Sequence, residues 1–214
     1  MNIRTQTRTE GRPTLHWLFV SRVRSRRVRR AASLVVACWI FLNPSLQAQS
    51  RSQESQEYPV KLAFLYNFTK FVEWPPSSYG EARSPLTICI VGDDPFSPDL
   101  ERELQTREVR GHPVEIKKLR PDADLNTCHI VFVPLTAETH AIRIVMRLKR
   151  SSILTIGETE GFAMLGGIIN LTIEGNKLHF EVNPVAADRA GLKISSKLLG
   201  LAKIVKEPNP GRQD

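Results

Sequence analysis

Two adjacent carboxylates, Asp93 and Asp94, follow an apolar run and precede Pro95, so they lie at a predicted turn between a strand and a helix. Turns at the carboxyl ends of strands are where α/β folds often bind ligands. This stretch has no glycine-rich phosphate loop, and two carboxylates at a helix N-terminus would repel phosphate. We therefore expect Asp93 or Asp94 mainly to cap the following helix, and we retain Asp93 as a candidate ligand contact.

A second candidate ligand site contains the pair Gly166-Gly167 and, three residues later, Asn170. Backbone amides of a glycine pair can bind an anion, although such a pair at the start of a strand more often forms a turn or a bulge. Gly166 and Asn170, together with Asp93, give the hypothesis of a small-ligand module whose occupancy is sensed by a partner protein.

The histidines do not form a catalytic pattern. His112, His129, His140 and His179 stand at no spacing typical of a nucleophile elbow or a zinc-protease helix. No carboxylate pair and no nucleophile with a nearby base stands out. The sequence therefore predicts a protein that is not an enzyme, with no catalytic residues, no metal site and no cofactor.

Aromatic side chains concentrate between residues 64 and 74. Phe64, Phe68 and Phe71 recur at helical spacing and form one apolar face, which is typical of core packing. Tyr66 lies off that face, and Trp74 is expected at the helix end before Pro75, where it can be exposed as contact residues often are. Tyr66 and Trp74 are therefore candidate contacts for a partner or a ligand.

Strands and helices alternate along most of the chain. Apolar periodicity and turn residues predict helices at 60–74 and 95–106, a helix capped by Thr136, and a last helix from Asn183 onward, with an apolar stripe reaching Val205. Strands are expected at 86–91, 114–119, 129–134 and 153–156, and a hairpin at 166–182. This order predicts a single α/β domain, a three-layer α/β/α sandwich with a mixed sheet.

The first 48 residues have the order of a secretory signal peptide. A basic run ending at Arg30 is followed by 12 apolar residues, by Pro44 and by a small-residue cleavage site at Ala48. Two alternatives remain open: a retained membrane anchor, and a lipid on Cys38, which ends a stretch similar to a lipobox. The predicted organisation is a signal peptide at 1–48, a flexible leader at 49–57, one domain at 58–206 and a disordered tail at 207–214.

The export signal accounts for the net charge of +8. Residues 1–30 contain nine arginines and one glutamate, whereas residues 49–214 contain 21 basic and 21 acidic side chains. A neutral mature chain does not favour nucleic acid as a partner.

Removal of the signal leaves two cysteines, Cys89 and Cys128, in an oxidising compartment. Both lie in or beside buried strands that a parallel sheet could hold as neighbours. A disulfide is the favoured interpretation, and two buried thiols are the alternative.

The segment VKLAFLYNFTKFVEWP at residues 60–75 resembles the opening signature of the YfiR family of periplasmic proteins. Similar blocks follow in the family's order and cover nearly the whole domain: IVGDDPF at 90–96, CHIVFV at 128–133, ILTI at 153–156, glycine-containing blocks within 161–170, FEVN at 180–183 and LKISSKLL at 192–199.

This resemblance implies a non-enzymatic α/β domain in the periplasm. The best-known member represses a membrane diguanylate cyclase by binding its periplasmic sensor region, and an outer-membrane lipoprotein sequesters that repressor. The expected partners are therefore the periplasmic domain of such a cyclase, an outer-membrane lipoprotein and a second copy in a homodimer. Cys89 and Cys128 match one cysteine pair of that member, which supports the disulfide, whereas its second pair would fall at Ala163 and Asn170.

Overall fold

The computed structural model describes residues 45–80 and 83–208, of which those from Arg51 onward belong to one compact unit. The helices, with two 3-10 turns labelled η, are α2 (Ser45–Phe71), η1 (Pro76–Ser78), α3 (Pro98–Gln105), η2 (Leu135–Ala137), α4 (Glu138–Leu148), α5 (Pro184–Arg189) and α6 (Ser196–Leu199). The strands are β1 (Val72–Glu73), β2 (Leu86–Val91), β3 (Glu108–Val109), β4 (His112–Leu119), β5 (Ile130–Val133), β6 (Leu154–Gly157), β7 (Ile169–Glu174), β8 (Lys177–Val182), β9 (Lys193–Ile194) and β10 (Lys203–Ile204).

Eight strands form one mixed sheet in the order β10-β8-β7-β6-β5-β2-β4-β3, and β1 pairs separately with β9. Strands β4, β2, β5, β6 and β7 pair in parallel, and β7 and β8 form the predicted antiparallel hairpin. Every residue of β2 and β5 is buried, as the continuous apolar runs indicate. Because β4 and β5 lie on opposite sides of β2, the strand order reverses between β2 and β5.

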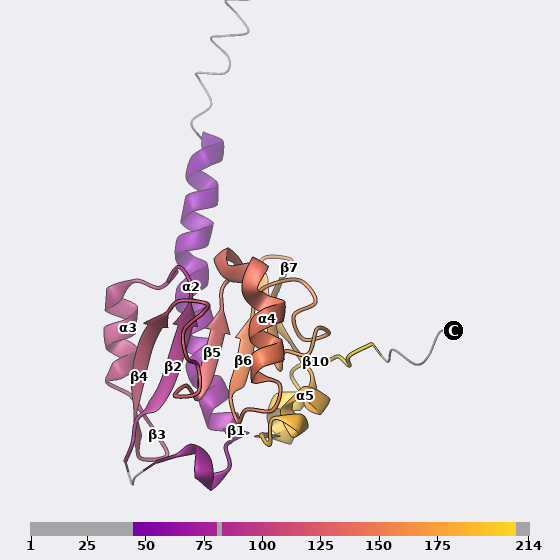
Figure 1. The fold of residues 1–214 in the computed structure, drawn as a ribbon. Coiled ribbons are helices and arrows are strands. Elements are labelled where there is room, and N and C mark those ends of the chain that lie inside the picture. Colours follow the sequence, from indigo (N-terminus) through magenta and orange to yellow (C-terminus); the bar gives the residue numbers. More distant parts are fainter. Residues whose placement is uncertain (1–44, 81–82, 209–214) are drawn as a thin grey trace, which may run out of the picture. The chain divides into compact units, whose positions relative to one another are not determined.

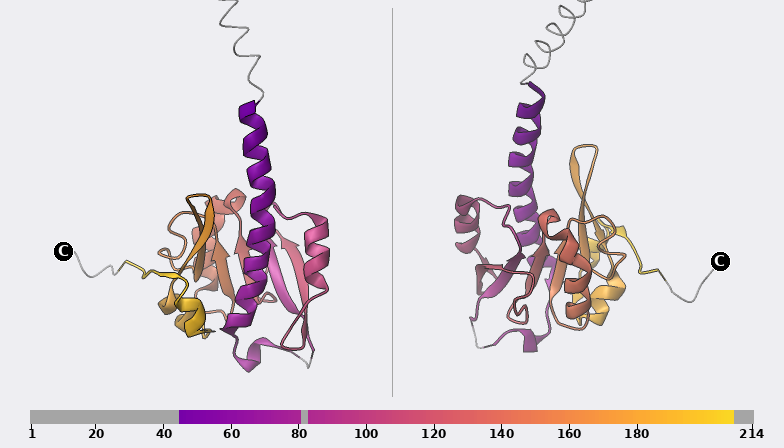
Figure 2. Two further views of the ribbon diagram at one scale, coloured as in Figure 1. Left: turned by 180° about the vertical axis from the view of Figure 1, so that it is seen from behind. Right: turned by 45° about the horizontal axis from the view of Figure 1, so that its top comes forward.

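Helices cover both faces of the sheet, which confirms the three-layer prediction (Figures 1 and 2). Alternate residues of each strand point to opposite faces. Ile88 and Phe132 belong to the core that includes Phe68 of α2. Val131 belongs to the core that includes Ile144 of α4.

The predicted disulfide joins Cys89 of β2 to Cys128, which immediately precedes His129 and β5, with 5.9 Å between the two Cα atoms. Both cysteines belong to the core on the α4 face. The bridge therefore connects the two neighbouring strands between which the strand order reverses.

Helix α2 begins earlier than the sequence predicts. The expected start is Val60, whereas the helix runs from Ser45, and Pro59 lies inside it. Residues 49–57, the predicted flexible leader, are therefore helical here. Glu, Gln, Ser and Arg are compatible with a helix, so the absence of an apolar stripe in this stretch did not exclude one. The signal peptide prediction falls mostly on residues 1–44, outside the described residues.

The predicted helix caps near residues 94 and 136 are wrong. Helix α3 is capped by Ser97, whose Oγ accepts a hydrogen bond from Leu100 N, whereas Asp94 accepts one from Phe96 N in a tight turn before the helix. Helix α4 follows η2, and its first residue is preceded by Ala137, which provides no side-chain cap. The Thr136 hydroxyl donates to Asp93 O instead, over 3.5 Å.

The predicted long C-terminal helix is divided into two short helices and two short strands. Asn183 caps α5 as expected, but α5 ends before Gly191, whose φ is +70°. Glycine adopts this left-handed conformation without steric cost, so the chain turns there. The apolar residues beyond it then alternate between β9, α6 and β10 and do not form one stripe.

Candidate functional site

The predicted ligand residue Asn170 belongs to a row of residues that crosses the sheet. Gly157 of β6 is in register with Asn170 of β7, which is opposite Glu181 of β8, and Glu181 is opposite Lys203 of β10. Strand β10 is the outermost strand on this side. The row therefore leads from the buried centre of the sheet to an open edge.

Three side chains of this row form a hydrogen-bonded cluster. Glu181 Oε2 accepts from Asn170 Nδ2 at 3.2 Å, and Glu181 Oε1 accepts from Lys203 Nζ at 2.8 Å. The hydrogen bond from Lys203 to the Glu181 carboxylate raises the pKa of Lys203. Asn170 and Glu181 are buried, whereas the Lys203 side chain is 68% exposed. The cluster thus fixes an exposed cation at the edge of the sheet.

Exposed apolar side chains lie next to Lys203. Leu201 is 76% exposed and Ile204 46% exposed. An edge strand also presents backbone groups that can pair with another chain. We call Leu201, Lys203 and Ile204, with the supporting Asn170 and Glu181, the β10 edge. Its combination of apolar groups, a fixed charge and open backbone is suited to binding a protein.

Gly166 lies in the loop before β7, where it allows the chain to pack closely against Val145 and Glu207. Its φ is +104°, and the neighbouring Gly167 lies against the ring of Phe162, so that a methyl group there would stand 2.2 Å from that ring. A methyl group at Gly157 would stand 2.5 Å from the same ring. Gly166 and Gly167 therefore have a steric role in packing Phe162 and the loop against the sheet.

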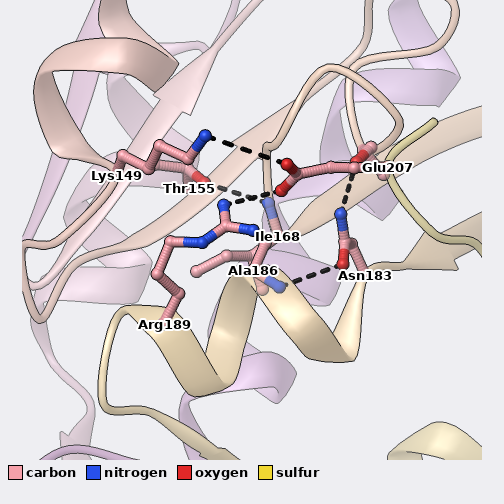
Figure 3. Close-up of polar contacts among 8 residues, drawn as sticks. Lys149, Thr155, Ile168, Asn183, Ala186, Arg189 and Glu207 are labelled. Carbon is pink, nitrogen blue, oxygen red and sulfur yellow. Dashed lines mark hydrogen bonds and ion pairs between the residues drawn. The ribbon is translucent and has the colours of Figure 1, made fainter. Parts of the chain in front are cut away.

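The first residue of the predicted disordered tail is bound to the domain. Glu207 accepts a hydrogen bond from Arg189 Nη1 at 2.6 Å and lies 3.8 Å from Lys149 Nζ (Figure 3). These contacts connect the chain beyond β10 to α5 and to the end of α4. Residues 209–214 lie outside the described residues, so the rest of the tail prediction stays untested.

Asn183 holds α5 beneath this segment with both ends of its amide (Figure 3). Its Oδ1 accepts from Ala186 N at 3.0 Å, and its Nδ2 donates to Ala163 O at 2.8 Å, with the residue fully buried.

Asn183→Ala should lower the free energy of unfolding by about 2–3 kcal/mol, since it removes a cap and leaves a buried carbonyl unpaired. Urea denaturation measures this loss. Asn183→Ser retains a capping oxygen and should lose about half as much; equal losses would contradict the assigned roles.

The structure separates Asp93 from Gly166 and Asn170. Asp93 is exposed after β2, and β5 and β6 lie between β2 and β7, a separation of roughly 14 Å. None of these three residues lines a described cavity. The described cavities therefore do not bring these three residues together, and the pocket that would combine them stays a prediction.

Asp94 lies in a charged group at the carboxyl end of β2. Lys118 Nζ is within 3.0 Å of Glu101 Oε1 and also pairs with Asp94 Oδ2 at 2.5 Å. Burial raises the pKa of Glu101, and its hydrogen bond to Asp94 raises it further. For Asp94, burial is outweighed by the hydrogen bonds from Glu101 and Lys118, which lower its pKa. The group connects β2, β4 and α3 and lines no described cavity, so we assign it a structural role.

The two aromatic candidates have different environments. Trp74 is 6% exposed, and its Nε1 donates to His129 O at 3.2 Å, so the expectation of an exposed side chain is wrong. Tyr66 is half-buried beside α3, and its ring lies under Lys70 Nζ at 4.2 Å. It lines a small cavity of about 210 Å³ between α2 and α3.

Hydrogen bonds of His129 connect the segment after Trp74 to the sheet. Its Nδ1 accepts from Thr87 N at 3.1 Å, which leaves the proton on Nε2 to donate to Ser78 O at 3.0 Å. The Tyr79 ring stacks between His112 and His129, at centroid distances of 4.2 and 5.2 Å. Burial, together with the positive potential of His112 and Lys117, lowers the pKa of His129, whereas its hydrogen bond to Ser78 acts in the opposite direction.

This arrangement predicts a loss of stability in acid. Because the pKa of His129 is lower in the folded protein than in the unfolded chain, the unfolded chain binds the proton first. The free energy of unfolding should therefore fall as the pH decreases from about 7 toward 5. His129→Asn supplies the same acceptor and donor without titrating there and should flatten this dependence, as measured by thermal melts at several pH values. The exposed His179→Asn is the control and should leave the slope unchanged.

Sequence reasoning missed Glu181, Lys203 and Glu207. Glu181 and Lys203 are paired through strand register across 22 residues, and Glu207 binds Arg189 across 18. The alternation in the predicted hairpin did not reveal Glu181, because it places Glu181 on the same face as Lys177 and His179, opposite Phe180 and Val182.

Among the described residues, no group of three or more His, Cys, Asp and Glu side chains could hold a metal ion. Every helix in the described part of the chain is too short or too polar to cross a lipid bilayer. What the fold and site define is an α/β domain with an exposed sheet edge that carries apolar groups and a fixed charge.

A sequence profile of the YfiR/HmsC-like family matches residues 58–203, and the chain therefore belongs to this family. Members are periplasmic proteins with regulatory rather than catalytic roles. The chain is also similar to a crystal structure of a conserved domain protein from Vibrio cholerae O1 biovar El Tor strain N16961, with 10% sequence identity and a TM-score of 0.44. That match covers 57% of this chain and 55% of the other.

Proposed function

We propose that this protein is an exported periplasmic regulator that binds and represses the periplasmic sensor region of an inner-membrane diguanylate cyclase, and so lowers cyclic di-GMP. The observation that carries this proposal is the family match over residues 58–203, which covers nearly the whole domain. The mature protein acts without catalysis, after cleavage of its signal peptide.

The β10 edge supports a role in binding a protein. Leu201 and Ile204 are exposed apolar side chains on either side of Lys203, whose ammonium group is held by Glu181. We assign the contact with the cyclase to this edge. The proposal also includes a homodimer and, by family likeness, sequestration by an outer-membrane lipoprotein.

Gene deletion and complementation test the proposal. Deletion should raise cyclic di-GMP and surface attachment, and the wild-type gene should restore both to their original levels. Leu201→Glu should restore neither, because a carboxylate on the apolar edge opposes burial in an interface. Ile173→Glu is the matched control, since Ile173 is 50% exposed on the β7–β8 hairpin, and it should complement fully. Unchanged cyclic di-GMP after deletion would contradict repression of a cyclase.

A small-ligand module remains a second candidate because of one groove. It measures about 520 Å³, and its polar lining includes Thr87, Glu115, Asn126, Ser152 and His129. This volume is in the range of small-molecule sites. Thermal shift measurements with fractionated periplasmic extract test it, since a ligand at 100 times its Kd adds about 2.7 kcal/mol. No shift with any fraction would argue against this function.

A further inference from the structure

The outward side of α4 and its neighbouring loop expose five large apolar side chains. Exposed fractions are 53% for Leu135, 55% for Ile142 and 68% for Met146, with 44% for Met164 and 48% for Leu165 in the loop after β6. The loop packs beside α4, since a methyl group at Gly166 would lie 3.3 Å from Val145 Cγ1. We call these five residues the α4 surface. Apolar side chains gathered in this way mark interaction sites.

The α4 surface is bordered by positive charge. Residues 138–150 contain four basic side chains and one acidic one, whereas residues 49–214 contain 21 of each. Arg143 and Arg147 are four residues apart, which places them on one side of α4, and the exposed Arg150 follows in the turn after the helix. Ile142 and Met146 also line a hollow of about 780 Å³ with Arg143 and Arg147.

Arg147 is held in place by hydrogen bonds to two uncharged groups. Its Nη1 donates to Pro121 O at 2.9 Å and its Nη2 donates to Ala123 O at 2.7 Å. Both acceptors are neutral carbonyl oxygens, so the guanidinium remains a fixed cation beside Met146. A fixed charge loses less side-chain entropy when a partner binds.

We propose that the α4 surface is a second protein-contact surface, separate from the β10 edge, that binds an acidic amphipathic helix of a partner protein. The apolar face of such a helix would cover Ile142 and Met146, and its carboxylates would pair with Arg143, Arg147 and Arg150. Strand β10 is three strands away from β6, which α4 contacts.

Two other occupants of the α4 surface are disfavoured, one by charge and one by residue composition. A second copy of this chain in a symmetric dimer would place the arginines of one α4 against those of the other, and like charges in an interface are costly. A lipid surface is disfavoured because Trp and Tyr are the residues enriched at membrane interfaces, and none of the five residues of the α4 surface is aromatic. Met and Arg are enriched in protein interfaces.

Photo-crosslinking in living cells tests this proposal. The full-length gene carries a stop codon, reassigned to p-benzoylphenylalanine, in place of the codon for Met146 or, for comparison, for Leu201 or Ile173. Position 146 should form an adduct whose crosslinked peptide, identified by mass spectrometry, is rich in Glu or Asp beside apolar residues. Arg143→Glu with Arg150→Glu should reduce this adduct at least about tenfold, because like charges then face each other. Lys177→Glu with Lys193→Glu makes the same charge change elsewhere and should leave the yield unchanged.

Several outcomes would overturn the proposal. These are no adduct at position 146, an adduct only with lipid or with a second copy of this chain, or a yield that the arginine reversals leave unchanged while circular dichroism shows a native fold. Flotation of the purified mature protein with phosphatidylglycerol vesicles, if prevented by the arginine reversals, would assign the surface to the membrane. Because the readout is the adduct, the α4 surface can be confirmed even if deletion leaves cyclic di-GMP unchanged.

Discussion

Replacing Cys89 and Cys128 together with alanine should lower the melting temperature of the protein by about 8–16 °C. The bridge closes a loop with a sequence separation of 39, and a loop of this length contributes about 4 kcal/mol in the chain-entropy account. For a domain of this size, each kcal/mol corresponds to about 2–4 °C. Differential scanning calorimetry of the purified protein, without reducing agent, measures the change.

Reduction provides the control for this pair. A strong reductant in the presence of mild denaturant should destabilise the wild type by a similar amount and should not affect the double variant. The single variant Cys89→Ala should lose about as much as the double variant, because either change removes the bridge. Melting temperatures that stay constant under all these changes would mean that the bridge does not stabilise the fold.

Lys61→Met should cost about 3–5 kcal/mol, because it leaves a buried carboxylate without its cation. Lys61 Nζ lies 2.7 Å from Glu158 Oε1, and the two side chains are 6% and 5% exposed. Glu158 also accepts from Leu135 N at 3.1 Å, so the pair connects α2 to the chain after β5 and β6. Urea denaturation measures the loss.

Two further variants separate the buried charge from the contact. Glu158→Gln combined with Lys61→Met should recover much of the loss, since no unpaired charge remains. Arg102→Met removes an exposed pair with Asp99, whose side chains are 75% and 84% exposed, and should change stability by less than about 1 kcal/mol. A similar loss for Arg102→Met and Lys61→Met would contradict the importance of burial.

The pH dependence of the Lys61 pair follows from its hydrogen bonds. Burial lowers the pKa of Lys61, but hydrogen bonds to Glu158 and Glu57 outweigh burial and raise the pKa above its usual value. Its stabilisation is therefore complete below the ordinary lysine range and is lost only as the pH rises above that range. The titration of Lys61 therefore lies far above the pH range of the acid sensitivity that His129 predicts.

Most of the sheet could be predicted from the sequence because its strands are encoded locally. Residues 86–91 and 129–134 are continuous apolar runs of the length of one strand, and the turn at Gly175-Asn176 specifies the hairpin. The prediction of one long C-terminal helix failed because the apolar spacing there is compatible with a helix. The turn at Gly191 and the pairing of β9 with β1, which is distant in the sequence, divide this segment instead. Tertiary pairing there outweighs local periodicity.

The candidate site was predicted only in part. Asn170 was identified from its own block, but its partners Glu181 and Lys203 come together through strand register, which one sequence does not specify. Trp74 was misassigned because its position before Pro75 suggested an exposed helix end. Its indole is buried instead, since the chain after it folds back to His129.

The Cys89–Cys128 bridge also determines what a protease can release. The residues between the two cysteines contain α3, β3 and β4, together with the loops around them. A single cut anywhere in this interval would leave both pieces covalently joined until the bridge is reduced. A nicked molecule would thus migrate as one chain on a non-reducing gel, whereas the same cut separates an unbridged chain into two fragments.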